Sequence, residues 1–87
     1  MSNQIENRRI GVVAIIVKNR DRAYGTLSEI FHSFGKIIVG RLGIPYRERN
    51  ISIIALVVDG STDEIGAMTG KIGQIEEVNV KTAFTNF

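Results

Sequence analysis

The chain of 87 residues contains no cysteine, and this absence removes several classes of chemistry. Disulfides, thiolate metal sites, iron–sulfur clusters and cysteine nucleophiles all require a thiol, so none of them is expected. A chain this short buries only a modest share of the surface that it exposes when unfolded, and small folds commonly compensate with disulfides. We expect association with another subunit to supply the missing stability.

The chain also has no large excess of charge of one sign and no long apolar run. Eleven Lys and Arg residues against nine Asp and Glu residues give a net charge of only +2, too small an imbalance to predict a surface that grips a phosphate backbone. The longest apolar run, residues 10–17, is too short to span a bilayer, and the polar start of the chain lacks the features of a signal peptide. We therefore expect a cytoplasmic protein that binds neither nucleic acid directly nor a membrane.

The remaining composition is typical of a globular domain. Hydrophobic residues make up 44% of the chain and charged residues 23%, so the low hydrophobicity of disordered segments is absent. The first residues are polar and precede a β-branched run. We predict a flexible N-terminal tail over residues 1–7 and a single folded domain over residues 8–87.

Hydrophobic periodicity predicts six elements in the order βαββαβ. The strands are expected over residues 9–18, 36–47, 50–59 and 78–84, and the helices over residues 21–34 and from residue 61 onward. Ser61 and Glu64 have the spacing of a capping box at the start of the second helix. Pro45 cannot donate a backbone hydrogen bond, so the second strand should lie at a sheet edge.

The helices should each bury one apolar stripe. The stripe of the first helix comprises Tyr24, Leu27, Ile30, Phe31 and Phe34. The stripe of the second helix comprises Ile65, Met68, Thr69 and Ile72. This element order is typical of the α+β ferredoxin-like fold, an antiparallel four-stranded sheet with both helices on one face.

In such a fold the other face of the sheet has no cover. Both alternating sets of side chains are apolar in the first and third strands, so one set must point away from the helices. Leaving several such side chains in water forgoes roughly 1.5–3 kcal/mol each and exposes a patch larger than soluble monomers usually tolerate. We expect this face to pair with a second copy of the chain, giving a dimer or tetramer.

Four segments carry a resemblance to a known family. Residues 40–45, the run 51–58, the glycine-rich stretch 65–73 and residues 78–82 are similar to the regulators of the iron-only hydrogenase system. The resemblance covers almost the whole chain and implies an ACT-like fold related to the C-terminal domain of the nickel-responsive regulator. It also implies oligomers built through sheets and a regulatory role, with a small-molecule effector or a separate regulatory or hydrogenase-system protein as partner.

Two departures limit what the resemblance implies. ACT domains typically begin the first helix with Asp-x-Pro-Gly, whereas Gly25 here follows Arg-Ala-Tyr, and Asp21 stands one position too early. This difference argues against an amino-acid effector. Nickel sensing in the related regulator needs several histidines and a cysteine, and this chain offers only His32, which we expect in solvent. No metal site and no cofactor are predicted.

The first strand-to-helix turn is the strongest candidate site. Exposed amide groups and the helix dipole favour an anion there, and Arg20 and Arg22 could clamp a carboxylate or phosphate. In the simpler alternative, Asn19 or Asp21 only caps the helix and the arginines are solvated. The candidate effector-binding residues, near this turn and the second strand at a subunit interface, are Asn19, Arg20, Arg22, Tyr24, Gly25, Thr26 and Arg41.

Glycines in the helices call for an explanation. Gly66, Gly70 and Gly73 together cost the second helix roughly 2–3 kcal/mol relative to alanines. We expect close packing against the sheet or a partner helix, the alternative being a helix that ends at Gly70 or Gly73. Gly25 has two interpretations, a close approach by a ligand or subunit and an incidental glycine near a helix end. None of these glycines forms a phosphate loop, because no hydroxyl follows the neighbouring lysine.

The sequence therefore favours a small oligomeric regulatory or sensory domain that is not an enzyme. A structural or protein-interaction module without a small ligand is the main alternative. An acylphosphatase-like enzyme shares the element order, but its phosphate-loop signature is absent from the first turn. RNA binding through the sheet would need aromatic residues on the central strands, and those strands carry none. With no DNA-reading element expected, a transcriptional role would act through a separate protein.

Overall fold

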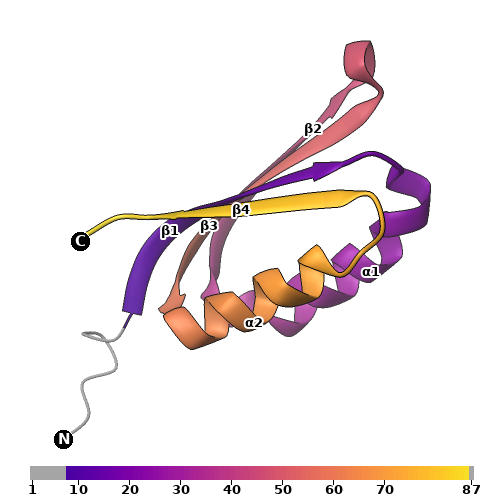
Figure 1. Ribbon diagram of the computed structural model, residues 1–87. Helices are drawn as coiled ribbons and strands as arrows, with labels where there is room; N and C mark the ends of the chain where they lie inside the picture. The colour runs from indigo at the N-terminus through magenta and orange to yellow at the C-terminus, as the bar shows by residue number, and fades with distance from the viewer. Residues whose placement is uncertain (1–7, 87) are drawn as a thin grey trace, which may run out of the picture.

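Four strands form one antiparallel sheet, and two helices cover one of its faces (Figure 1). The computed structural model describes residues 8–86. The elements are β1 (Arg8–Val17), α1 (Arg20–Ser33), β2 (Ile38–Tyr46), β3 (Ile51–Ser61), α2 (Thr62–Gly73) and β4 (Val78–Phe84), with strand order β2-β3-β1-β4. The predicted ferredoxin-like βαββαβ order is confirmed. The tail predicted over residues 1–7 lies outside the described residues.

The central strands supply the middle of the core. β-Branched residues favour extended backbone, and alternate side chains of a strand point to opposite faces of the sheet. In β1 the side chains of Val13, Ile15 and Val17 face the helices and are at most 1% exposed. Leu56 and Val58 of β3 lie on the same face and are fully buried. The core therefore lies between the middle of the sheet and the two helices.

Side-chain caps define where the helices begin. The Asn19 side chain accepts a hydrogen bond from the backbone N–H of Arg22 at 3.3 Å, which starts α1. At α2 the predicted capping box is confirmed: the Glu64 N–H donates to the Ser61 hydroxyl, and the Ser61 N–H donates to the Glu64 carboxylate, both at 3.0 Å. The second contact holds the pKa of the Glu64 carboxyl below its usual range, because the backbone N–H of Ser61 stabilises the charged form.

The buried stripe of α1 differs in part from the predicted one, and Phe34 lies just beyond the helix end and is half-buried. Leu27, Ile30 and Phe31 are buried as expected, but Ala23 joins them and Tyr24 is 55% exposed. Tyr24 lies at the margin of the helix face that meets the sheet, so its ring faces an open space beside the core. In α2 the predicted stripe holds, with Ile65, Met68 and Ile72 buried and Thr69 half-buried.

Close packing does not explain the glycines of α2 within the described chain. A Cβ placed on Gly66 or Gly70 would meet no atom within 4 Å, so the prediction of close packing against the sheet is wrong at these positions. A Cβ on Gly73 would reach Val80 at 3.6 Å, an ordinary contact. The helix runs through Gly66 and Gly70 and ends at Gly73, as the alternative predicted.

The hairpin of β2 and β3 extends past the start of α1 and away from the helices (Figure 1). β2 lies at the sheet edge, as Pro45 predicted. A short 3₁₀ turn at residues 47–49 and Asn50, in the left-handed region with φ of 55°, join the two strands. All residues from 41 to 50 are exposed, so the helices do not bury the outer half of the hairpin.

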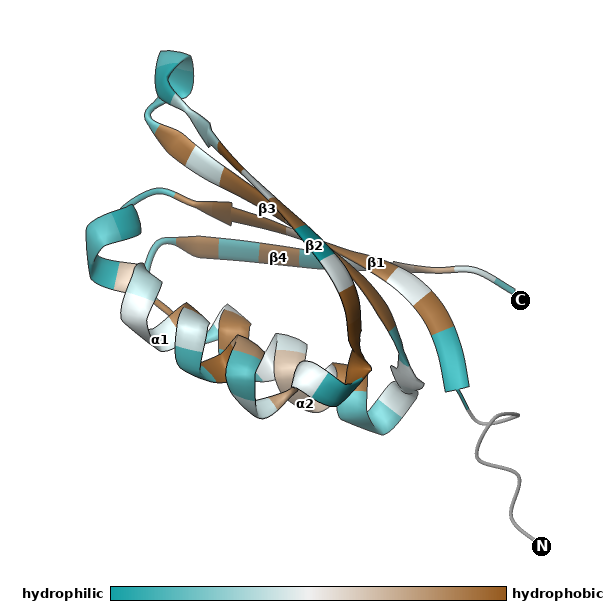
Figure 2. Cartoon of the chain, turned by 180° about the vertical axis from the view of Figure 1, so that it is seen from behind, coloured by the Kyte–Doolittle hydropathy of each residue, from teal (hydrophilic) through white to brown (hydrophobic). Residues whose placement is uncertain are grey.

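The face of the sheet opposite the helices is apolar and uncovered in the described chain, as predicted. The cartoon coloured by hydropathy shows apolar bands along the strands of this sheet (Figure 2). Strand register and burial assign the following apolar residues to this surface, the open face: Ile10, Val12, Ala14, Ile16, Leu42, Ile44, Tyr46, Ile51, Ile53, Ala55 and Val57. Association through the open face stays a prediction.

Candidate functional site

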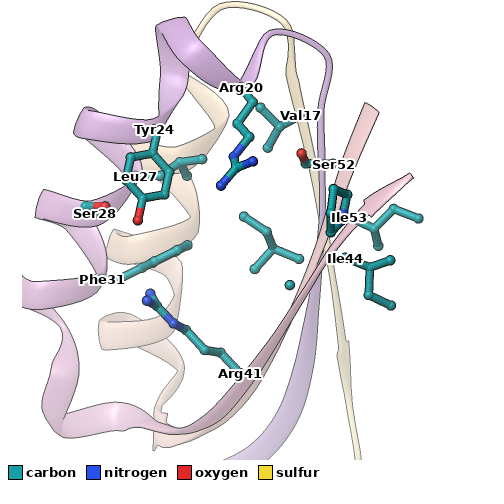
Figure 3. Close-up of a pocket in the computed structure, with 13 residues that line it drawn as sticks. Val17, Arg20, Tyr24, Leu27, Ser28, Phe31, Arg41, Ile44, Ser52 and Ile53 are labelled. Carbon is teal, nitrogen blue, oxygen red and sulfur yellow. The ribbon is translucent and has the colours of Figure 1, made fainter. Parts of the chain in front are cut away.

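A cavity lies between α1 and the projecting hairpin, on the helix side of the sheet (Figure 3). Its volume is about 290 Å³, near the lower limit of about 300 Å³ for small-molecule sites. The residues that line it from the first half of the chain are Val17, Arg20, Tyr24, Leu27, Ser28 and Phe31. The residues that line it from the hairpin are Arg41, Gly43, Ile44, Pro45, Ser52, Ile53 and Ile54.

The cavity lies where the hairpin runs away from α1 (Figure 1). Alternation along β2 directs Arg41, Gly43 and Pro45 toward the helix side, opposite Leu56, Ile54 and Ser52 of β3. Gly43 has no side chain to fill the space, and a Cβ placed there would meet no atom within 4 Å. The gap between α1 and the hairpin therefore stays open at Gly43.

Two arginines enter the cavity from different elements. Arg20 projects from the first turn of α1 and Arg41 from β2, as Figure 3 shows. The Arg20 guanidinium lies 5.6 Å from the centre of the Tyr24 ring, and the Arg41 guanidinium lies 5.2 Å from the centre of the Phe31 ring. Within residues 8–86 neither arginine forms an ion pair with a carboxylate. The cavity thus has an apolar floor and two uncompensated positive charges.

The structure brings together three of the seven residues predicted from the sequence. Arg20, Tyr24 and Arg41 line the cavity. Asn19 instead caps α1, and Arg22 points elsewhere, with Nη1 3.4 Å from a carboxylate oxygen of Glu76.

Two further predicted residues lie on the exposed side of α1. A Cβ placed on Gly25 would meet no atom within 4 Å, and Thr26 borders a shallow hollow between the helices that Ile75 and Glu76 also line. Neither Gly25 nor Thr26 lines the cavity. Their assignment to an effector site stays a prediction that the neighbouring surface of a second copy would have to complete.

Sequence reasoning missed the lining residues whose role depends on tertiary position. Phe31 was assigned to the core, and its buried ring also supports Arg41. Ser28 follows Tyr24 by one helical turn, and this spacing could have indicated it. Gly43 could have been indicated only weakly, because it lies two residues after Arg41 and therefore on the same face of the strand.

Metal and membrane sites receive no support from the described part of the chain. Across residues 8–86, no three His, Asp or Glu side chains gather in a group that could hold a metal ion. His32 is exposed on α1. The helices of this region are too short or too polar to cross a membrane.

The fold and the cavity together define a small ferredoxin-like domain with a cavity that two arginines line. The family model for TM1266-like proteins, described as "Iron-only hydrogenase system regulator, putative", matches residues 9–82. The chain belongs to this family, as the sequence segments indicated.

A solved structure supports the same assignment. The chain is similar to the uncharacterized protein TM1266 from Thermotoga maritima, with 42% sequence identity and a TM-score of 0.86. The match covers 91% of this chain and 99% of that protein. No curated protein matches the sequence.

Proposed function

We propose that the chain is a self-associating regulatory module of an iron-only hydrogenase system, and that a small effector binds in the cavity between α1 and the β2–β3 hairpin. The observation that carries this proposal is that one hairpin forms both a wall of the cavity and part of the open face. Arg41 and Gly43 face the cavity, whereas Leu42 and Ile44 face the opposite side of the same strand. The family description supports the regulatory part.

The open face has the size and character of a subunit interface. Strands of 7 to 11 residues in a four-stranded sheet give a face of ~30 Å by ~19 Å, or on the order of 600 Å². That area approaches the roughly 800 Å² that each partner buries in a standard interface. Arg8 and Asp59 pair with each other at 3.3 Å near one end, and Lys81 lies on the outer strand β4, so the middle of the face carries no charge. A second copy offers the same uncharged middle.

Effector binding and association are coupled in this proposal through the hairpin. Figure 3 shows Ile44 and Ile53 pointing away from the cavity, toward the open face, while their strands line the cavity. A ligand that changes the angle between hairpin and α1 would therefore change the fit of the open face to a partner. Such coupling is reciprocal, so association would also change effector affinity.

The experiment is a thermal-shift screen of the purified chain against small anions, amino acids, nucleotides and metal ions. The proposal expects one saturable stabiliser, followed by sedimentation velocity with and without it. A ligand that stabilises the fold and shifts the oligomer distribution supports the coupled function. A complete absence of saturable binding would contradict the effector site and favour the module that only binds proteins.

The proposal includes a cytoplasmic location, a partner protein and no catalysis. The partner would be a separate regulatory or hydrogenase-system protein that responds to whether the effector is bound. An acylphosphatase-like activity remains the enzymatic alternative because of the shared element order. Release of phosphate from an acyl phosphate by the purified protein, at a rate that scales with protein concentration, would contradict the non-enzymatic assignment.

A further inference from the structure

We infer that the cavity binds a small carboxylate with an apolar body and no ammonium group, such as an aliphatic 2-oxo acid. This inference rests on the effector site proposed above and specifies its chemistry. Arg20 and Arg41 are the carboxylate-binding residues. The apolar floor of the cavity holds the hydrocarbon body.

The charges of the cavity favour an anion. Two guanidinium groups line it, and its lining includes no Asp or Glu. Each guanidinium lies over an aromatic ring, at 5.6 Å for Arg20 on Tyr24 and 5.2 Å for Arg41 on Phe31. A cation–π contact uses none of the N–H donors of a guanidinium, and two of these donors match the two oxygens of a carboxylate.

The volume and the floor favour a ligand with a short hydrocarbon part. The cavity measures about 290 Å³, which excludes nucleotides and large cofactors as fully enclosed ligands. Val17 and Leu27 are buried beneath it, and Ile54 is half-buried. Burying a hydrocarbon against these side chains gains about 0.025 kcal/mol per Å² of apolar surface, a contribution that inorganic anions such as phosphate do not make.

The same lining disfavours a free amino acid. An ammonium group would lie in the same cavity as the two arginines, and no Asp or Glu in the lining would offset its charge. Its hydrogen-bond partners would be the Ser28 and Ser52 hydroxyls or backbone carbonyls, which offer no compensating charge. A 2-oxo acid keeps the carboxylate and the body of the amino acid and lacks this penalty.

The test is isothermal titration calorimetry of the full chain with matched ligands. The series comprises acetate, 4-methyl-2-oxopentanoate, phenylpyruvate, L-leucine, 4-methyl-2-pentanone and inorganic phosphate. We expect at least one of the two apolar oxo acids to bind with a Kd below roughly 1 mM. L-Leucine and the uncharged ketone should bind at least about tenfold more weakly than 4-methyl-2-oxopentanoate, because leucine adds an ammonium group and the ketone lacks the carboxylate.

Variants assign the binding to the two arginines. Arg20→Met and Arg41→Met keep an unbranched apolar side chain and remove the charge, so each should weaken oxo-acid binding at least about tenfold. Arg47→Met removes the same charge at the exposed hairpin tip, outside the cavity lining, and should leave binding unchanged. Circular dichroism of each variant checks that the fold is intact.

The outcomes separate this inference from the effector site itself. If L-leucine binds as tightly as its oxo acid, or if neither oxo acid binds, the inferred ligand chemistry is wrong. If a neutral or cationic ligand binds instead and Gly43→Val blocks it, the effector site stands and only its chemistry is overturned. If Gly43→Val leaves every observed binding event unchanged, the cavity is not the site and both proposals fail.

Discussion

Gly43 decides whether the cavity exists, because it is the position on the helix side of β2 where a side chain would project into the open space. Its neighbours on the same strand face, Arg41 and Pro45, border the cavity without filling it. The backbone at Gly43 has a negative φ, so a larger residue meets no conformational penalty. Gly43 thus matters for the cavity because it has no side chain that would occupy the space.

Gly43→Val should close part of the cavity and leave the fold intact. Valine favours the strand conformation and glycine weakens it, so the free energy of unfolding should stay equal or rise by about 0.5–1 kcal/mol. Effector binding measured by calorimetry should be lost, whereas urea unfolding should show no loss of stability. A fall in the free energy of unfolding would indicate that the space around Gly43 is smaller than described.

Glu64 gives the fold a defined acid sensitivity. Its pKa is lowered chiefly by the N–H of Ser61, so the folded state prefers the ionised carboxyl. A lowered folded-state pKa contributes stability above the ordinary glutamate range, and this contribution disappears as the pH falls through the folded-state pKa. The stability difference between the native chain and Glu64→Gln, from urea unfolding at several pH values, should therefore shrink toward acid. A difference independent of pH would contradict this role.

Ser61 should contribute through the other half of the capping box. Ser61→Ala leaves the Glu64 N–H without its acceptor and should lower the free energy of unfolding by about 1 kcal/mol. Thr62→Ala, one position further along, lies on the exposed side of the helix start and serves as the matched control. Chemical denaturation of both variants measures the difference.

At the scale of elements, the two kinds of glycine behave differently. Gly60 in β3 is buried, and a Cβ there would lie 2.8 Å from Cγ2 of Ile37. Gly66 and Gly70 in α2 have open space around them. One glycine is thus required by packing within the chain, and the other two are not.

Substitution by alanine should separate these cases. Gly66→Ala and Gly70→Ala should each raise the free energy of unfolding by about 0.5–1 kcal/mol, because alanine restricts the unfolded chain and favours helix. Gly60→Ala should lower it by about 1–3 kcal/mol through overpacking against Ile37. Loss of association by Gly66→Ala in sedimentation velocity would instead show that a partner approaches this face of α2.

The elements themselves could be predicted from the sequence because their signals are local. These signals are the alternating and helical periodicities, the capping box and Pro45, and each depends on only a few neighbouring residues. The order of strands and helices that they predict is the observed one. The cavity could be predicted only in part, since Arg20 and Arg41 are brought together by the pairing of β2 with β3 and the position of α1. How far the hairpin extends beyond the helices is a tertiary property, and neither Gly43 nor Ser52 indicates it in the sequence.

At the scale of the whole molecule, the open face is the feature that a single chain leaves uncovered. Val57 lies in the middle of this face, opposite Val12 of β1, and is 41% exposed. An apolar surface of this extent is more than soluble monomers usually leave in water. Assembly is therefore expected to be part of the stability of this protein.

Val57→Lys should dissociate the assembly. A lysine there would place an unpaired charge in the middle of the interface, so sedimentation velocity should show a shift toward monomer. Ala67→Lys adds the same charge on the exposed side of α2 and should leave the oligomer unchanged. If the native chain itself sediments as a monomer at high concentration, the assembly proposal is wrong.

The exposed outer half of the hairpin also means that the free energy of local unfolding differs between parts of this protein. Residues 41–50 are all exposed, and no strand lies beyond β2 in the sheet of the described residues, so their amide hydrogens should exchange with deuterated water well before those of β1. Occupation of the cavity or pairing of the open face would each slow that exchange. Deuterium uptake at the hairpin can therefore report on either event without any label attached to the ligand or the partner.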